Sequence, residues 1–317
     1  MRYFRLLLIC SLLFTAQRAQ ALELFGDFLY WRATEPVDWV LNTNRTPADQ
    51  FVDYKTIAFN FAPGFRVGME QQGDWDTRLG YTHFQTTSSE SAAGNLTPAF
   101  LGSKLALPSN PIVPTPYYFD TGQQQSAINY NVLDWDLGKR YNPSDVLVVR
   151  PLVGLRAAWI NQNFNTAFQG AWPSSLTSES IVERMHNNFW GIGPKVGVEN
   201  SWTMAAGEEW QVSLMANFYT SFLLGFWSIN DVTDIASTVI GFPASSQKIV
   251  QVHNRDFGAL AFQTIVGLNL KYQNWSASAG YELNDWLNQC QIFDDATGPH
   301  NNDLLLQGLI LRVMVGF

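Results

Sequence analysis

Charged side chains recur at every second position in several stretches of this sequence, and apolar side chains occupy the positions between them. In "FNFAPGFRVGME", Arg66 and Glu70 alternate with Phe65, Val67 and Met69. A period of two is the period of a β-strand, so the charges of each stretch share one face. Rows of opposite charge can line an aqueous path for ions, or they can pair with one another as buried salt bridges.

If these strands close into a barrel, the charged face is turned towards the lumen. The side chains that we predict to line a pore are Arg66, Glu70, Arg78, Asp134, Asp136, Arg150, Arg156, Lys195, Glu199, Lys271, Glu282 and Arg312. Positive and negative charges are nearly balanced in this set, which predicts weak ion selectivity. The alternative is a narrow barrel that is plugged by buried ion pairs. Glycines on the same face, among them Gly154 and Gly267, favour open space inside.

Histidine near a carboxylate could instead catalyse hydrolysis, because such a pair can activate water. His83, His186, His253 and His300 all fall towards one end of the expected strands, and acidic residues such as Asp256 lie nearby in the sequence. Such residues are also ordinary on polar loops, and the sequence contains no G-x-S-x-G nucleophile motif. We therefore assign no catalytic residue, and the sequence indicates neither a metal site nor a cofactor.

Two adjacent stretches show the expected strands most clearly. "GALAFQTIVGLNLKYQ" and "NWSASAGYELN" both alternate apolar with polar residues, and a tight turn near Gln273 and Asn274 separates them, which predicts a hairpin. We expect ten strands in all, or twelve if a connection hides a further hairpin. Their predicted ranges are 22–33, 56–71, 74–87, 127–140, 146–166, 186–200, 209–224, 254–273, 275–288 and 302–317.

The connections between these strands alternate in length. The short ones are "QGD", "YNPSD", "SWTMAAGEE" and "QN", and the long ones cover 34–55, 88–126, 167–185, 225–253 and 289–301. Short periplasmic turns and long outer loops are typical of outer-membrane barrels. Pro63, Pro151 and Pro194 lie inside expected strands, where a backbone donor is lost, and they predict local bulges.

The N-terminus carries an export signal. Arg2 and Arg5 precede a short apolar run, and Ala19-Gln20-Ala21 matches a cleavage site. The predicted division of the chain is a signal peptide over 1–21 and a β-barrel over 22–317. Removal of the signal peptide lowers the number of Lys and Arg residues from 19 to 16 against 27 Asp and Glu, a net charge of −11. So acidic a chain is a poor candidate for binding nucleic acid.

The remaining chain has the composition of a membrane-spanning sheet. Cys290 is its one thiol, which excludes an internal disulfide framework. The sequence after the signal contains no uninterrupted apolar run of the length that a transmembrane helix needs. A sheet can span a membrane only as a closed barrel, because lipid leaves no partner for free backbone groups. The sequence therefore predicts an all-β fold, a single antiparallel transmembrane β-barrel located in the outer membrane.

Aromatic residues lie near the ends of the expected strands, where they favour the headgroup region of a membrane. The predicted girdle consists of Trp135, Trp159, Trp190, Trp210, Tyr272, Trp275 and Phe317. The closing stretch "LLLQGLILRVMVGF" alternates down to Phe317, so we expect the last strand to pair with the first and close the barrel.

Six stretches resemble the Legionella-type major outer membrane protein family. They are "GDFLYWRA", "VLDWDLGKRY", "RPLVGLRAAWINQ", "FWGIGPKVGVENSW", "GYELNDWLNQ" and "LQGLILRVMVGF", in the expected order across nearly the whole chain after the signal. The resemblance implies a pore-forming outer-membrane β-barrel and brings no catalytic residues with it. The closing stretch departs from the family, whose members more often carry a charge near the last aromatic residue. The ranges 34–55 and 88–126 show no likeness.

These features together predict an outer-membrane porin for passive diffusion of small solutes or ions. One alternative is a narrow or plugged barrel that acts as an adhesin or structural surface protein through its outer loops. A second alternative is a hydrolase at the outer rim. The expected partners are outer-membrane lipids, lipopolysaccharide and the barrel-insertion machinery that would recognise the strand ending at Phe317. A homo-oligomer with further copies of the chain is left open as an alternative to a monomer.

Overall fold

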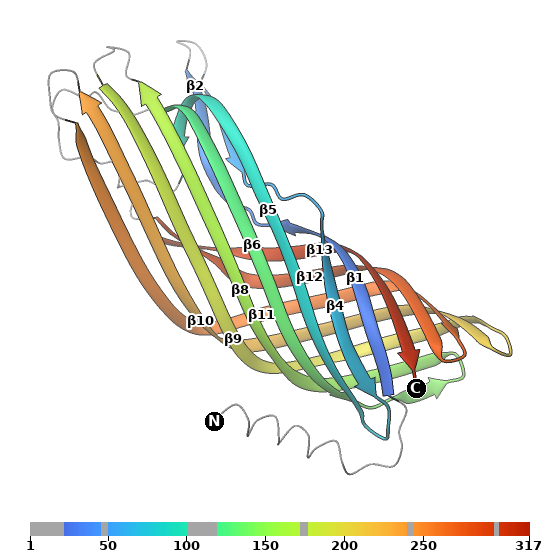
Figure 1. Cartoon of the computed structure of the whole chain (residues 1–317). Coiled ribbons are helices and arrows are strands. Elements are labelled where there is room, and N and C mark those ends of the chain that lie inside the picture. Colours follow the sequence, from blue (N-terminus) through green and yellow to red (C-terminus); the bar gives the residue numbers. More distant parts are fainter. Residues whose placement is uncertain (1–21, 46–49, 100–118, 172–176, 240–243, 295–297) are drawn as a thin grey trace.

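The computed structural model describes residues 22–317 apart from 46–49, 100–118, 172–176, 240–243 and 295–297. The signal peptide expected over 1–21 lies outside the described residues. Every described element is a β-strand (Figure 1). Within the described ranges, no helix is long and apolar enough to cross a membrane.

Ten strands form a closed antiparallel ring, as the alternation in the sequence predicts. In chain order they are β1 (Leu22–Thr34), β4 (Ala62–Gln71), β5 (Asp76–Pro98), β6 (Phe119–Gly138), β8 (Leu147–Ala171), β9 (Thr177–Ala206), β10 (Trp210–Val239), β11 (Ser245–Tyr272), β12 (Trp275–Asp294) and β13 (Gly298–Gly316). The other described strands are β2 (Asp38–Arg45), β3 (Gln50–Thr56) and β7 (Tyr141–Ser144), which pair at the margins of the ring.

The last strand closes the ring against the first. Asp27 of β1 lies opposite Arg312 of β13, and the backbone N–H of Phe317 donates to the carbonyl of Leu22 at 2.9 Å. The expected closure is confirmed, and it removes the free edges that lipid could not satisfy. The tight turn between β11 and β12 is also confirmed, with Gln273 at a φ of 50°.

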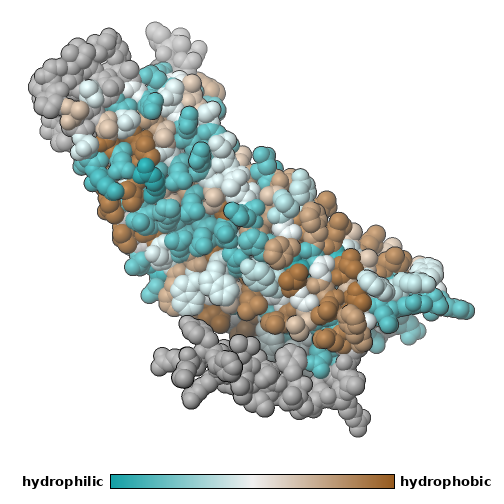
Figure 2. Space-filling model, in the orientation of Figure 1, coloured by the Kyte–Doolittle hydropathy of each residue, from teal (hydrophilic) through white to brown (hydrophobic). Residues whose placement is uncertain are grey.

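The two faces of the wall differ as the sequence pattern predicts. On β8, Val153 is 54% exposed, whereas Arg156 and Ala158 on the opposite parity are buried. The ten residue-to-residue steps from Val149 to Trp159 rise about 25 Å at ~3.3 Å per residue and a tilt of ~40°, which matches the apolar band of outer-membrane barrels. Figure 2 shows hydrophobic patches gathered over the lower part of the visible wall and a mostly hydrophilic surface above them.

The predicted long outer loops are an error of the sequence interpretation, because most of their residues continue the strands. β5 runs on to Pro98, β9 begins at Thr177, and β10 reaches Val239. Beyond the membrane many outward side chains are polar, for example Asn161, Asn163 and Asn165 on β8, so the contrast between faces that predicted strands nearer the periplasm is weakened. The hairpin of β2 and β3 occupies the predicted loop 34–55, but it pairs with the end of β5 and does not enter the ring.

The bulges predicted at three prolines are also wrong. Pro63, Pro151 and Pro194 keep the regular register with a neighbouring strand. At Pro194 the pairing of β9 with β10 is interrupted without a shift, because proline has no N–H to donate. Gly193 beside it has no Cβ, and a Cβ there would collide with the carbonyl oxygen of Phe222 on β10.

Cysteine labelling tests this register. V153C should react with a lipid-soluble maleimide, because the side chain at this position points outwards, while A158C should stay unlabelled inside the wall. The protein should carry C290A as the background, although Cys290 is itself fully buried. A reversed labelling pattern would mean that the strand is shifted by one residue, since such a shift exchanges the two faces.

Candidate functional site

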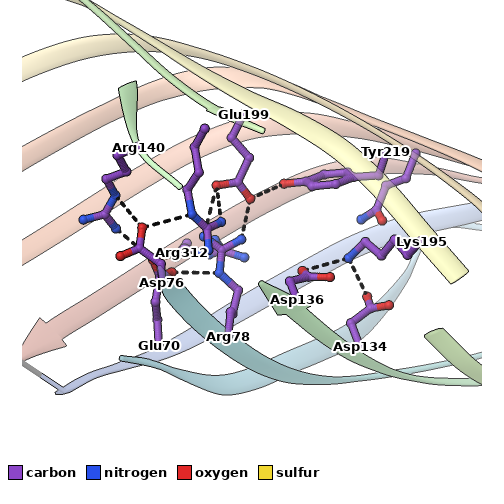
Figure 3. Close-up of polar contacts among 12 residues, drawn as sticks. Glu70, Asp76, Arg78, Asp134, Asp136, Arg140, Lys195, Glu199, Tyr219 and Arg312 are labelled. Atoms are coloured by element: carbon purple, nitrogen blue, oxygen red, sulfur yellow. Dashed lines mark hydrogen bonds and ion pairs between the residues drawn. The ribbon is translucent and has the colours of Figure 1, made fainter. Parts of the chain in front are cut away.

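The periplasmic half of the barrel interior contains a layer of opposite charges, which we call the ionic layer. Inward positions of the strands bring its members together, and Figure 3 shows many of them reaching towards one another from different strands. The layer consists of Arg66, Arg78, Arg150, Arg156, Lys195 and Arg312 together with Asp27, Glu70, Asp76, Asp134, Asp136, Glu199 and Glu282.

Arg66 joins two carboxylates from different strands. Its guanidinium donates to Asp27 of β1 at 3.1 Å and to Glu282 of β12 at 2.8 Å. Asp27 also accepts two hydrogen bonds from Arg312 of β13, at 2.7 and 2.8 Å. All of these side chains are largely withdrawn from water, so each charge depends on its partners for compensation.

A line of hydrogen bonds continues from Glu282 across the lumen. Gln263 of β11 donates to Glu282 at 2.6 Å and accepts from Arg156 of β8 at 2.6 Å. Arg156 holds Asp134 in a two-pronged pair at 2.7 and 2.9 Å. Lys195 of β9 lies 3.3 Å from Asp134. Because β8 and β11 are not neighbours in the ring, these contacts span the interior rather than follow the wall.

A second group of charges lies closer to the periplasmic end (Figure 3). Glu199 of β9 accepts from Arg78 of β5 at 3.1 Å, from Arg150 of β8 at 2.9 Å and from the hydroxyl of Tyr219 at 2.8 Å. Arg78 also donates to Glu70 of β4 at 2.8 Å. The bond between Arg78 and Glu199 joins β5 to β9, which are not adjacent in the ring, so it crosses the lumen, whereas the other bonds join neighbouring strands.

Aromatic rings cross the lumen on the outer side of the ionic layer, and we call them the aromatic layer. Trp31, Tyr130, Trp286, Phe189 and Trp227 form a continuous series with ring centroids 4.5–6.4 Å apart. They come from β1, β6, β12, β9 and β10, and each is at most 2% exposed. The lumen is therefore closed twice, once by ion pairs and once by packed rings.

The outer part of β12 leaves the wall and reaches across the interior. Its pairing with β11 ends at Leu287, its register against β13 shifts between Trp286 and Cys290, and Asn288 takes a φ of 55°. The carbonyl of Gln289 then accepts from the indole N–H of Trp227 on β10 at 3.2 Å. This bend places one side of the β12–β13 hairpin over the aromatic layer.

A polar cavity of about 540 Å³ lies at the periplasmic end of the barrel. Its lining includes Lys271, Arg312, Arg150 and Glu199, together with Asn, Gln and Ser side chains of β9 to β12. Lys271 makes no ion pair within the described part of the chain. The cavity thus ends at the charges of the ionic layer.

Glu35 lies between β1 and β2, beyond the apolar band, as the polar outward neighbours Arg32 and Thr34 indicate. The side-chain amide of Gln162 donates to its carboxylate, and Asn187 donates to Gln162 at 3.0 Å. Burial raises the pKa of the Glu35 carboxyl from 4.5 to about 8, since no basic side chain of the described residues compensates for the lost water.

This pKa predicts that alkali destabilises the outer part of the barrel. Glu35 ionises near 4.5 when unfolded and near 8 when folded, so its contribution to the free energy of unfolding is present below pH 4.5 and is lost by pH 8. The loss should be about 4–5 kcal/mol. Urea midpoints between pH 4 and 9 should therefore fall less steeply for E35Q than for the wild type. Parallel pH profiles of the two proteins would contradict this assignment.

The structure gathers most of the charged residues that were predicted to line a pore. Eleven of the twelve belong to the ionic layer, and Lys271 lies in the periplasmic cavity. Their role as a pore lining stays a prediction. Sequence reasoning missed the neutral side chains Gln263 and Tyr219, which hydrogen-bond to the ionic layer, and it missed Trp31 and Trp286 of the aromatic layer. The spacing of Trp31 could have revealed its place, because it lies four residues after Asp27 on β1 and therefore shares the inward face of that strand.

The residues of the predicted girdle are exposed on the outer wall. Trp159 and Trp190 are register partners on β8 and β9, towards the outside of the cell. Trp210, Tyr272 and Trp275 are register partners at the periplasmic end. The remaining two are Trp135 near the periplasmic end of β6 and Phe317 at the end of the chain.

The histidines of the described side chains contact amides rather than acids. His83 Nδ1 lies 2.8 Å from Asn131 Oδ1, and His186 Nδ1 lies 2.6 Å from Asn163 Oδ1. The side chains of His253 and His300 lie outside the described part. Among the described residues, no group of three or more His, Cys, Asp or Glu gathers as a metal site.

Comparison with known proteins identifies a family. The family model described as Legionella pneumophila major outer membrane protein precursor matches residues 15–317. A search of the curated proteins found no match.

Solved structures with similar chains include an outer-membrane protease and two toluene transporters. The protease OmpT from Escherichia coli is 10% identical, with 96% of this chain and 100% of that chain covered and a TM-score of 0.43. The toluene transporter TodX of P. putida is 10% identical over 95% and 91%, with a TM-score of 0.29. The toluene transporter TbuX of Ralstonia pickettii is 11% identical over 95% and 90%, with a TM-score of 0.31.

Proposed function

Since this chain belongs to the Legionella pneumophila major outer membrane protein family, we propose that it is a porin that is closed in the structure described. The protein is an outer-membrane β-barrel. In our proposal, small solutes and ions enter the periplasmic cavity and pass only when the ionic and aromatic layers rearrange. Diffusion is passive, and the barrel itself provides the path.

The observation that supports a pore is the polar cavity that leads to the ionic layer. A barrel with a purely structural role could fill its interior with apolar side chains, which avoids the cost of burying charge. Here charged side chains from eight strands meet inside, and the cavity of about 540 Å³ opens towards them. Ion pairs can exchange partners with passing ions, whereas a packed apolar core cannot.

The aromatic layer supports a second candidate, a permanently closed barrel that acts at the cell surface. The strands of the barrel reach well beyond the apolar band, for example from Asn161 to Ala171 on β8, and present a polar wall outside the membrane. An adhesin or structural surface protein would need this wall and no path. A hydrolase at the rim has less support, because His83 and His186 contact asparagines.

Planar-bilayer recordings of the purified full-length protein separate the two candidates. A gated porin should show a mostly closed baseline with brief openings, and the nearly balanced charges of the ionic layer should give weak selectivity between cations and anions. Swelling of liposomes in small sugars should be slow but measurable against empty liposomes. A protein that never conducts and passes no solute would overturn the porin and favour the closed barrel.

A further inference from the structure

A dense group of asparagine side chains covers the outer wall directly above the outer aromatic residues. The group comprises Asn129, Asn131, Asn161, Asn163, Asn165 and Asn188, and we call it the amide belt. These residues lie on β6, β8 and β9, which are neighbours in the ring, and all point away from the lumen. Asparagine is depleted in β-strands, so six in adjacent strands call for a cause other than strand formation.

The register places the amide belt at the edge of the apolar band. Trp159 and Trp190 face each other across β8 and β9, and Trp190 stacks on Phe226 with ring centroids 4.5 Å apart. At the next outward-facing residue of each strand, two residues further from the periplasm, Asn161 faces Asn188. On β8 and β9, aromatic rings therefore give way to amides within two residues. Such a change is expected at the depth where the lipid headgroups begin.

The chemistry of the amide belt is neutral and both donating and accepting. The four cross-strand rows that contain its members have no acidic residue at an outward position of β6, β8 or β9, and the charge of the outward Arg184 opposite Asn165 is paired with Asp234 of β10 at 2.7 Å. Each asparagine offers two donors and one acceptor oxygen. The amides of Asn161, Asn165 and Asn188 make no side-chain hydrogen bond within the described residues. They are free to bind a ligand without breaking an internal contact.

We propose that the amide belt binds the saccharide headgroup of an outer-leaflet glycolipid such as lipopolysaccharide. Sugar hydroxyls both donate and accept hydrogen bonds, which matches amides better than it matches charged side chains. The amphipathic rings of Trp159 and Trp190 lie where headgroup and acyl chains of such a lipid meet. The belt continues the lipid-facing wall upwards, so one molecule can place its chains on that wall and its sugars on the amides.

The test is a binding titration on the purified full-length protein with short-core lipopolysaccharide as the probe. The variant N161A/N188A removes two amides that face each other and have no internal partner. It should weaken binding by on the order of tenfold, since each hydrogen bond contributes a factor of several. The matched control Q123A/Q169A removes two exposed amides further out on β6 and β8, beyond the headgroup region, and should leave binding within about twofold.

Two comparisons identify what is recognised. Phosphatidylglycerol has acyl chains and a negative charge but no sugar ring, and it should bind more weakly than lipopolysaccharide. Binding of lipopolysaccharide by the amides should change little between low and high salt, because the belt is neutral. The proposal is overturned if N161A/N188A binds like the wild type, if both double variants lose binding equally, or if phosphatidylglycerol binds as tightly.

Discussion

Replacement of Arg66 by alanine is expected to lower the free energy of unfolding by about 3–5 kcal/mol, because removal of one partner leaves a buried charge uncompensated. Arg66 pairs with Glu282 at 2.8 Å and with Asp27 at 3.1 Å. Asp27 keeps Arg312, but Glu282, whose side chain is fully buried, keeps only the amide of Gln263 among the described residues. The midpoint of heat-induced loss of the folded band on gels, together with urea unfolding followed by tryptophan fluorescence, measures the effect.

Two variants make this prediction specific. R184A removes an arginine whose partner Asp234 and own side chain are both more than 40% exposed, and it should cost less than about 1 kcal/mol. R66Q/E282Q removes both charges of the main pair and should recover part of the loss. Equal stability of R66A and R184A would mean that the ionic layer is solvated and does not hold the barrel closed.

Replacement of Trp286 by alanine is expected to raise the conductance of the barrel at least about tenfold, because a dry aromatic constriction excludes ions until it is wetted. Trp286 of β12 contacts Tyr130 of β6 and Phe189 of β9, strands that are not its neighbours in the ring, with centroids 5.9 and 6.3 Å apart. Its loss interrupts the aromatic layer at a central member. The adjoining ion pairs can then exchange with water and salt. Planar-bilayer current at fixed voltage is the measurement.

The control for this effect is W210A, which removes an exposed tryptophan from the periplasmic end of the wall. It should leave the conductance unchanged, although it also removes a large aromatic ring. W286A is expected to lose about 3–5 kcal/mol of stability from the cavity, so a folded band on gels must accompany each recording. A folded W286A that stays silent would show that ion pairs alone seal the lumen, and it would favour the surface-barrel candidate.

Local alternation predicted the ring because a β-barrel exposes its faces to two different solvents. Val153 and Leu155 face lipid while Arg150 and Arg156 face inwards, so apolar and polar residues alternate along the strand and the alternation can be recognised in the sequence. The same reasoning failed for the outer strands. Ser88 to Ala93 on β5 and Gln123 to Ala127 on β6 have polar or small residues on both faces, so nothing in their sequence separates a strand from a loop.

The candidate site was predictable in its residue types but not in its contacts. Parity placed Arg66 and Glu282 inside, yet they lie 216 positions apart in the chain. Which charges meet across the lumen depends on the stagger of ten strands, and a shift of one pair of residues between neighbours would change every partner. For the aromatic layer, residue type alone does not distinguish an inward Trp31 from a tryptophan of the girdle, and only the parity that Trp31 shares with Asp27 separates the two.

The sequence by itself determined that the chain is a barrel, where its ring closes and which face of each strand meets lipid, since these follow from period-two patterns within single strands. Only the tertiary structure decided that the lumen is closed, because closure depends on side chains such as Arg156 and Gln263 that meet from strands far apart in the chain. It also decided that the wall continues beyond the membrane and that asparagines of three strands align there as one surface. Such features are properties of register, and register is fixed only when all strands pair at once.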